Sequence, residues 1–182
     1  SQSARQNIFD INNSWGEKAE EILMDKINKK GKYRARRTTL GYKFPDLTLF
    51  DKNMKKVCFI EVKMASSTFM KIQEKLPNAN ITPSELVVLN NSAINSYKKV
   101  LDQYKLPIYI VFFVANRPCI TKDQDYKLYY QNFEVIYDIY QKQKENRTYR
   151  RNTVKGDHDD QGKIQNPLLK VHFSINELLP YE

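Results

Sequence analysis

Two short apolar runs separated by a polar turn constrain this chain more than any other feature. Residues 44–50 (FPDLTLF) predict a strand that opens on a Pro-Asp pair, and residues 58–63 (CFIEVK) predict a second strand that ends on Glu-x-Lys. Successive side chains of a strand point to opposite faces, so Glu61 and Lys63 share one face. If the two strands are antiparallel neighbours, Asp46 lies beside Glu61, and two carboxylates meet one lysine at a sheet edge.

This combination of side chains favours metal-assisted chemistry. Two carboxylates with an open coordination sphere suit Mg²⁺, which keeps several waters and binds phosphate oxygens. A lysine close by can orient or deprotonate an attacking water, and phosphodiester hydrolysis needs these parts. The alternative is a surface hairpin with an ordinary cross-strand pair between Glu61 and Lys63.

The spacing of Pro45-Asp46 and Glu61-Val62-Lys63 resembles the motif of the PD-(D/E)xK nuclease superfamily, which includes type II restriction endonucleases and Holliday-junction resolvases. The resemblance implies a restriction-endonuclease-like α/β fold, Mg²⁺ as cofactor and double-stranded DNA as partner. It implies that Asp46 and Glu61 are catalytic and bind the metal together with the carbonyl of Val62. Lys63 then corresponds to the catalytic lysine of the motif.

An amphipathic helix is expected upstream of the first strand. Ser14 and Glu17 have the spacing of a capping box, so the pattern predicts a helix from about residue 14 to residue 29. Members of the resembled superfamily often carry Gly-x-x-x-Glu on such a helix, and here that pattern falls on Gly16 and Glu20. Glu20 is therefore a candidate catalytic acid, with Glu17 as its competitor. The alternative for Glu17, Glu20 and Glu21 is a solvated helix face.

The periodicity predicts a mixed β-sheet flanked by helices, with the core order α-β-β-β-α-β at residues 14–116. After the first helix, strands are expected at 33–40, 46–50 and 57–64, a short helix at 69–76, a helix at 82–104 and a strand at 106–115. The last of these strands is apolar throughout, which is typical of a parallel strand buried on both faces. We expect a single domain over residues 1–182.

Residues 117–182 form an extension for dimerisation or DNA contact. Aromatic side chains at helical spacing predict a helix at 123–140 that packs into the core or a dimer interface, with base stacking as the less favoured role. The polar stretch 141–166 is rich in Lys and Arg, and we expect Arg147, Arg150 and Arg151 to bind DNA. A final strand at 168–173 precedes a short helix capped at Ser174.

Composition narrows the partner and the compartment. The formal charge of +9 on 182 residues suits a polyanion, although charge alone does not separate nucleic acid from an acidic membrane surface. No apolar run is long enough to cross a bilayer, so we expect no membrane partner. Cys58 and Cys119 both lie in apolar surroundings and are expected to be buried and reduced, which favours a cytoplasmic protein.

These observations predict a Mg²⁺-dependent endodeoxyribonuclease that hydrolyses phosphodiester bonds. The length of the extension favours a type II restriction endonuclease, which needs additional polypeptide to read base edges. A Holliday-junction resolvase or another structure-specific nuclease is the alternative, and a catalytically silent DNA-binding module is a further one. Cutting both strands of a duplex with one site per chain favours a twofold homodimer. Zinc-protease, P-loop and Gly-x-Ser-x-Gly motifs are absent from the sequence.

Overall fold

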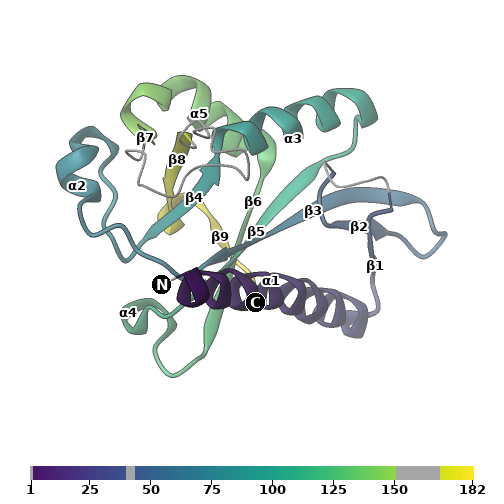
Figure 1. The fold of residues 1–182 in the computed structure, drawn as a ribbon. Coiled ribbons are helices and arrows are strands. Elements are labelled where there is room, and N and C mark those ends of the chain that lie inside the picture. The colour runs from purple at the N-terminus through teal and green to yellow at the C-terminus, as the bar shows by residue number, and fades with distance from the viewer. Residues whose placement is uncertain (1, 40–43, 151–168) are drawn as a thin grey trace.

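The computed structural model describes the backbone of residues 2–39, 44–150 and 169–182, and the side chains from Trp15 onward within these ranges. Helices and strands alternate along the chain in an irregular order (Figure 1). Their bounds are α1 Gln2–Lys30, β1 Arg34–Arg37, β2 Leu47–Phe50, β3 Lys56–Ala65, α2 Ile72–Lys75, η1 Pro77–Ala79, β4 Leu86–Asn90, α3 Asn91–Tyr104, β5 Ile108–Ala115, α4 Pro118–Thr121, β6 Tyr126–Asn132, α5 Phe133–Arg147, β7 Thr148–Arg150, β8 Leu169–Ser174, η2 Ile175–Glu177 and β9 Leu179–Pro180.

The main sheet has the strand order β1-β2-β3-β5-β6-β9. β3 and β5 are parallel, and every other neighbouring pair in this sheet is antiparallel, so the sheet is mixed, as the sequence predicted. β5 lies between β3 and β6 and is buried along most of its length. This burial explains why residues 108–115 show no alternation of apolar and polar side chains.

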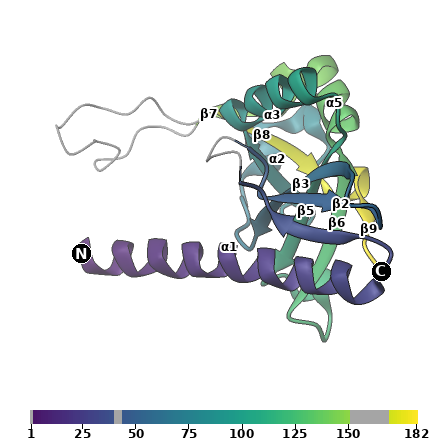
Figure 2. The same ribbon diagram turned by 90° about the vertical axis from the view of Figure 1, so that its right-hand side faces the viewer.

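Helices cover both faces of the main sheet, with α1 on one side and α3 and α5 on the other (Figures 1 and 2). Alternate residues of β3 serve the two layers. Cys58 and Ile60 pack with Ala19 and Leu23 of α1, whereas Phe59 packs with Ile94 of α3 and its neighbours. Glu61 and Lys63 have the same parity as Phe59 and therefore lie on the α3 side of the sheet.

A second, three-stranded sheet, β4-β8-β7, corrects the prediction of one helix over 82–104. The run Leu86-Val87-Val88-Leu89 forms β4 and pairs antiparallel with β8, and only the segment from Asn91 onward forms the helix α3. The apolar side chains of this run fit both a strand and a helix face. Pairing with a strand more than 80 residues away decides between the two, and the local pattern does not contain that information.

The helix predicted at 123–140 is also corrected, because this segment is a strand followed by a helix. β6 pairs with β5 over Tyr126–Asn132, and the Asn132 side chain then accepts a hydrogen bond from Glu134 N–H and caps α5. The aromatic residues consequently serve two layers: Tyr126 and Tyr130 pack on the α1 side, whereas Phe133 packs on the α3 side. Their role in packing agrees with the prediction.

The two ends of α1 differ in how well the sequence indicated them. α1 ends at Lys30 and is followed by Gly31 at φ 69°, a left-handed conformation that glycine adopts readily. Ser14, in contrast, lies inside the helix, which begins at Gln2, so it is not an N-cap.

Cys58 is buried as expected, whereas Cys119 is exposed on the short helix α4. Among the described residues, no helix has the length and apolarity that a membrane span requires.

Candidate active site

The pairing of β2 with β3 brings together the three residues of the Pro-Asp and Glu-x-Lys motif. Leu47 is the partner of Ile60 in the antiparallel register, so Asp46, one residue earlier, stands beside Glu61. Oδ2 of Asp46 accepts a hydrogen bond from the main-chain N–H of Val62 at 2.8 Å. Lys63 Nζ forms an ion pair with Glu61 Oε1. The two carboxylates and the ammonium group thus gather at the carboxyl-terminal end of β3.

Glu61 is the most deeply buried of these groups, with 5% of its surface exposed. Burial raises its pKa above the ordinary value, and the nearby negative charge of Asp46 acts in the same direction. The ammonium of Lys63 and a hydrogen bond from Tyr97 oppose the rise. A carboxylate in these surroundings is stabilised by any further positive charge that reaches it.

Asp46 and Glu20 have similar electrostatic surroundings. The pKa of Asp46 is raised, chiefly by burial, although the Val62 N–H and the charge of Lys63 act against the shift. The pKa of Glu20 is raised by burial first and by the charge of Asp46 second. Glu20, on α1, is therefore close enough to the strand carboxylates for the charges of Asp46 and Glu61 to raise its pKa. Oε2 of Glu20 lies 3.7 Å from Nη2 of Arg37.

The other acids of α1 are less well placed. Glu21 is the second partner of Arg37, at 3.5 Å, and its side chain is mostly exposed. Glu17 is exposed, and its charge is a smaller contribution to the raised pKa of Glu20 than that of Asp46. Of the two candidate helix acids, Glu20 is the one next to the carboxylates of the strands.

Tyr97 is a member of the site that the sequence did not indicate. It lies on α3, is 4% exposed and packs edge-on against Phe133, and its hydroxyl donates a hydrogen bond to Glu61. Burial, followed by the charge of Glu61, raises its pKa, so the hydroxyl keeps its proton. In the sequence Tyr97 is one of several apolar and aromatic positions on the α3 face, and nothing in that pattern separates it from Tyr104.

Arg117 is a second residue that sequence reasoning missed. Its guanidinium is buried and donates to three carbonyl oxygens, those of Ser67, Ser84 and Leu86. These bonds fasten the segment that follows β3 to the start of β4. The position of the chain directly beyond Lys63 therefore depends on Arg117.

The donor set fits a hard divalent cation. Asp46, Glu61 and the Val62 carbonyl offer oxygen ligands, and burial of adjacent carboxylates is a cost that a bound cation offsets. Among the described residues, no three side chains of His, Cys, Asp or Glu lie close enough to form a ready metal cage. Mg²⁺ does not require one, because it usually keeps several waters and takes one or two carboxylates.

The predicted DNA-binding arginines have different surroundings. Arg147 is 4% exposed, and its guanidinium forms an ion pair with Glu177 and bonds to the carbonyl of His172. Its expected contact with DNA is therefore corrected to a structural role, joining α5 to the end of β8. Arg150 is exposed at the end of β7, and Arg151 lies outside the described residues.

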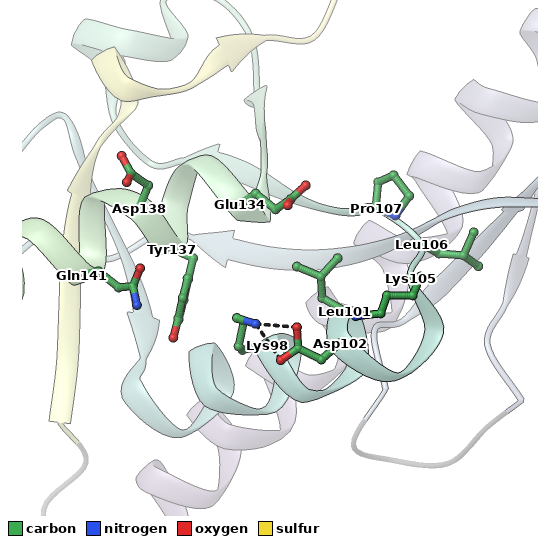
Figure 3. Close-up of a pocket in the computed structure, with 10 residues that line it drawn as sticks. All are labelled: Lys98, Leu101, Asp102, Lys105, Leu106, Pro107, Glu134, Tyr137, Asp138 and Gln141. Atoms are coloured by element: carbon green, nitrogen blue, oxygen red, sulfur yellow. Dashed lines mark hydrogen bonds and ion pairs between the residues drawn. The ribbon is translucent and has the colours of Figure 1, made fainter.

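A separate cavity of about 570 Å³ lies between α3 and α5 (Figure 3). Its lining includes the exposed ion pair between Lys98 and Asp102, together with Glu134 and Tyr137. It contains none of Asp46, Glu61 and Lys63. The Lys98–Asp102 pair is exposed to solvent, where ion pairs contribute little to stability.

The chain matches no protein-family model, and it matches none of the curated proteins. Among solved structures it is similar to Hjc, a Holliday junction resolvase from the archaeal hyperthermophile Archaeoglobus fulgidus. The TM-score is 0.47 at 12% sequence identity, and the match covers 91% of this chain and 90% of that chain.

Proposed function

We propose that this protein is a metal-dependent endonuclease that hydrolyses phosphodiester bonds of DNA. The observation that supports the proposal is the meeting of Asp46, Glu61 and Lys63 at one end of β3, with the two carboxylates on adjacent strands. Two hard carboxylates and a lysine are the groups that metal-assisted hydrolysis of a phosphate ester uses. A surface hairpin with an ordinary ion pair would leave these side chains solvated, and Glu61 is 5% exposed.

In this proposal Asp46, Glu61 and the Val62 carbonyl hold Mg²⁺. The bound ion supplies Lewis acidity and a water of lowered pKa. Lys63 orients the attacking water and stabilises the negative charge that develops on the phosphate oxygens. Glu20 contributes a further negative charge from α1, close enough to Asp46 to raise its own pKa.

DNA is the proposed partner because a basic surface adjoins the carboxylates. β1 is the edge strand next to β2, and Arg34 and Arg36 are exposed on it. Arg36 is the register partner of Thr48, which follows Asp46 by two residues in the chain. Exposed arginines on the strand next to β2 can bind the phosphates that flank the one that is cut. The formal charge of +9 favours the same partner.

Structure-specific cleavage is the finer assignment that we propose first. The length of residues 117–182 favours restriction only if this segment reads base edges. The fold uses much of it otherwise: β6 and β9 complete the main sheet, α5 covers one face and β8 pairs with β4. Less polypeptide remains for base reading, so site-specific restriction becomes the second candidate. In either case, a twofold homodimer would place two sites on one substrate.

Cleavage assays with a panel of DNA molecules test this proposal. A four-way junction, a linear duplex of the same sequence, a single strand and a supercoiled plasmid would each be incubated with Mg²⁺ and with EDTA. We expect Mg²⁺-dependent cleavage, with the junction cut at the lowest enzyme concentration. Discrete plasmid fragments with an intact junction would favour restriction. Binding without cleavage of any substrate would leave the silent DNA-binding module as the function.

A further inference from the structure

A cavity of about 390 Å³ lies on the α1 side of the main sheet, at the end of the parallel strands β3 and β5. Aromatic side chains form part of its wall, and three polar side chains accompany them. The aromatic residues are Trp15, Phe113 and Tyr126, and the polar ones are Ser66, Asn116 and Asp125. The walls of the cavity are thus largely apolar, and its polar side chains offer both hydrogen-bond donors and acceptors. This combination is typical of sites that bind small planar ligands.

Trp15 is the most unusual residue of this cavity. It is the only tryptophan of the chain, and 48% of its surface is exposed. Lys18 Nζ lies 4.8 Å from the centre of the Trp15 ring, so a positive charge accompanies the exposed indole. Phe113 and Tyr126 are already packed together, with ring centres 5.1 Å apart. An exposed aromatic surface with a cation beside it suits a planar ligand that is attached to a phosphate.

The cavity adjoins the candidate active site along two elements. Ala19 of α1 lines the cavity, and the next residue is Glu20. Met64 of β3 lines it as well, and the preceding residue is Lys63. Because neighbouring strand residues point to opposite faces, the cavity and the carboxylates lie on the two sides of the same strand end. A polynucleotide that crosses this end of β3 meets both.

We propose that this cavity receives an unpaired nucleobase of the DNA substrate, next to the phosphate that is cut. The inference rests on the proposed nuclease function and adds the substrate feature that the enzyme would recognise. A base stacked within a duplex does not expose its faces, so only an unstacked base can pack against Trp15 and Tyr126. Ser66, Asn116 and Asp125 supply hydroxyl, amide and carboxylate groups for the hydrogen-bonding edge of the base. Lys18 is placed to contact the attached phosphate.

The single tryptophan makes the proposal directly measurable. Trp15 fluorescence would be titrated in Ca²⁺ with three oligodeoxynucleotides: a single strand, the same single strand with abasic sites throughout, and a fully paired duplex of equal length. Stacking of a base on the indole quenches its emission, so we expect saturable quenching by the first molecule only. Equal quenching by all three, or none by the first, would overturn the proposal. A change on dilution without DNA would show that a second copy of the chain covers Trp15, which also overturns it.

Substitutions separate stacking from a general effect on folding. Trp15→Ala should weaken binding to DNA with unpaired bases by about 5- to 150-fold, the range for loss of one stacked base, and should change duplex binding little. Trp15→Phe should retain most of the affinity because it keeps an aromatic face. Val135→Ala, which truncates another exposed apolar side chain on a helix, is the matched control and should bind as the parent does.

Failure of this inference differs from failure of the proposed function. If no DNA is cut, yet the single strand quenches Trp15 and Trp15→Ala loses that binding, the base site stands and the catalytic assignment falls. If DNA is cut in Mg²⁺ and Trp15→Ala binds unpaired substrates as tightly as the parent, the base site is wrong and the nuclease remains.

Discussion

The main-chain N–H of Val62 donates a hydrogen bond to Oδ2 of Asp46 at 2.8 Å, and this bond ties the start of β2 to the end of β3. Since Asp46 precedes the first residue of β2, its side chain would otherwise be held only by a loop. The antiparallel register of β2 and β3 places Asp46 beside Glu61. The bond therefore fixes both the rotamer of Asp46 and the spacing of the two carboxylates.

The first prediction concerns the two strand carboxylates. Asp46→Asn and Glu61→Gln should each lower the single-turnover cleavage rate in Mg²⁺ by more than about 100-fold, because each removes the charge of a proposed metal ligand while keeping the shape of the side chain. Affinity for DNA measured in Ca²⁺ should persist in both variants. Asp102→Asn, an exposed acid on α3, is the control and should cut at the parental rate. Cleavage by either site variant at the parental rate in saturating Mg²⁺ would refute the assignment.

The second prediction concerns Lys63. Lys63→Ala should slow the chemical step with little change in DNA affinity, since in the proposed mechanism the ammonium, which pairs with Glu61, acts on the reacting groups. Lys63→Arg should not restore the rate, because a guanidinium has a different shape and does not lose its proton. Single-turnover rates in Mg²⁺ and affinities in Ca²⁺ separate the two effects. Parental cleavage by Lys63→Ala would show that the lysine has only a structural role.

How far the sequence determined this structure depended on the range of the interactions involved. The β2–β3 pair was predictable because its strands are local, joined by a short turn and patterned by alternation. The sequence pattern predicts helices where β4 and β6 form strands, because their apolar and aromatic side chains fit both the helical and the strand period. Their pairing with β8 and β5 decides the outcome, and such pairing is not visible locally.

The site shows the same division between local and distant information. Asp46, Glu61 and Lys63 follow from strand parity and a hairpin register. Tyr97 reaches Glu61 from a helix more than 30 residues further along, and Arg147 is buried because Glu177 comes from the end of the chain. The polar stretch around Arg147 predicts an exposed side chain, whereas the ion pair with the distant Glu177 buries it.

The third prediction tests Tyr97 as a positioning residue. Tyr97→Phe should lower kcat by about 10- to 100-fold, as for groups that orient metal ligands, and should leave DNA affinity unchanged. Loss of the hydroxyl removes a hydrogen bond that lowers the pKa of Glu61, so the acidic limb of the pH–rate profile should move to higher pH. Tyr140→Phe removes the hydrogen bond from the Tyr140 hydroxyl to Asn91 in the same core and is the matched control. An unshifted profile in Tyr97→Phe would leave Tyr97 as a packing residue only.

The fourth prediction separates two neighbouring arginines. Arg147→Ala should destabilise the fold by about 3 kcal/mol, measured by urea denaturation, because Glu177 loses the partner that neutralises it. Arg150→Ala should leave stability unchanged and reduce the slope of log affinity for DNA against log salt by about one unit. An unchanged salt slope would remove Arg150 from the DNA-binding surface. An Arg147→Ala protein of parental stability would contradict the structural role of that ion pair.

The fifth prediction follows from the raised pKa values of Glu20, Asp46 and Glu61. A group whose pKa is higher in the folded state than in the unfolded state favours folding while it is protonated. Its contribution to stability is therefore complete below the pKa of the unfolded state, and it is lost as the pH rises through the pKa of the folded state. At pH 8 without metal these carboxylates therefore oppose folding. Mg²⁺ should raise the Tm at pH 8, and less so near pH 5.

Asp46→Asn isolates one of these three groups. The amide oxygen can still accept the Val62 hydrogen bond, while the buried negative charge is removed. We expect this variant to be more stable than the parent by about 0.5–2 kcal/mol at pH 8 in EDTA, the usual gain from relieving an unfavourable functional charge. The difference should shrink as the pH falls, because the parent then becomes protonated at Asp46. The Mg²⁺-induced rise in Tm should also be smaller than in the parent. Calorimetry at pH 5 and pH 8, with EDTA and with Mg²⁺, measures all three effects. A variant less stable than the parent at pH 8 without metal would show that the Asp46 charge supports the fold and does not oppose it.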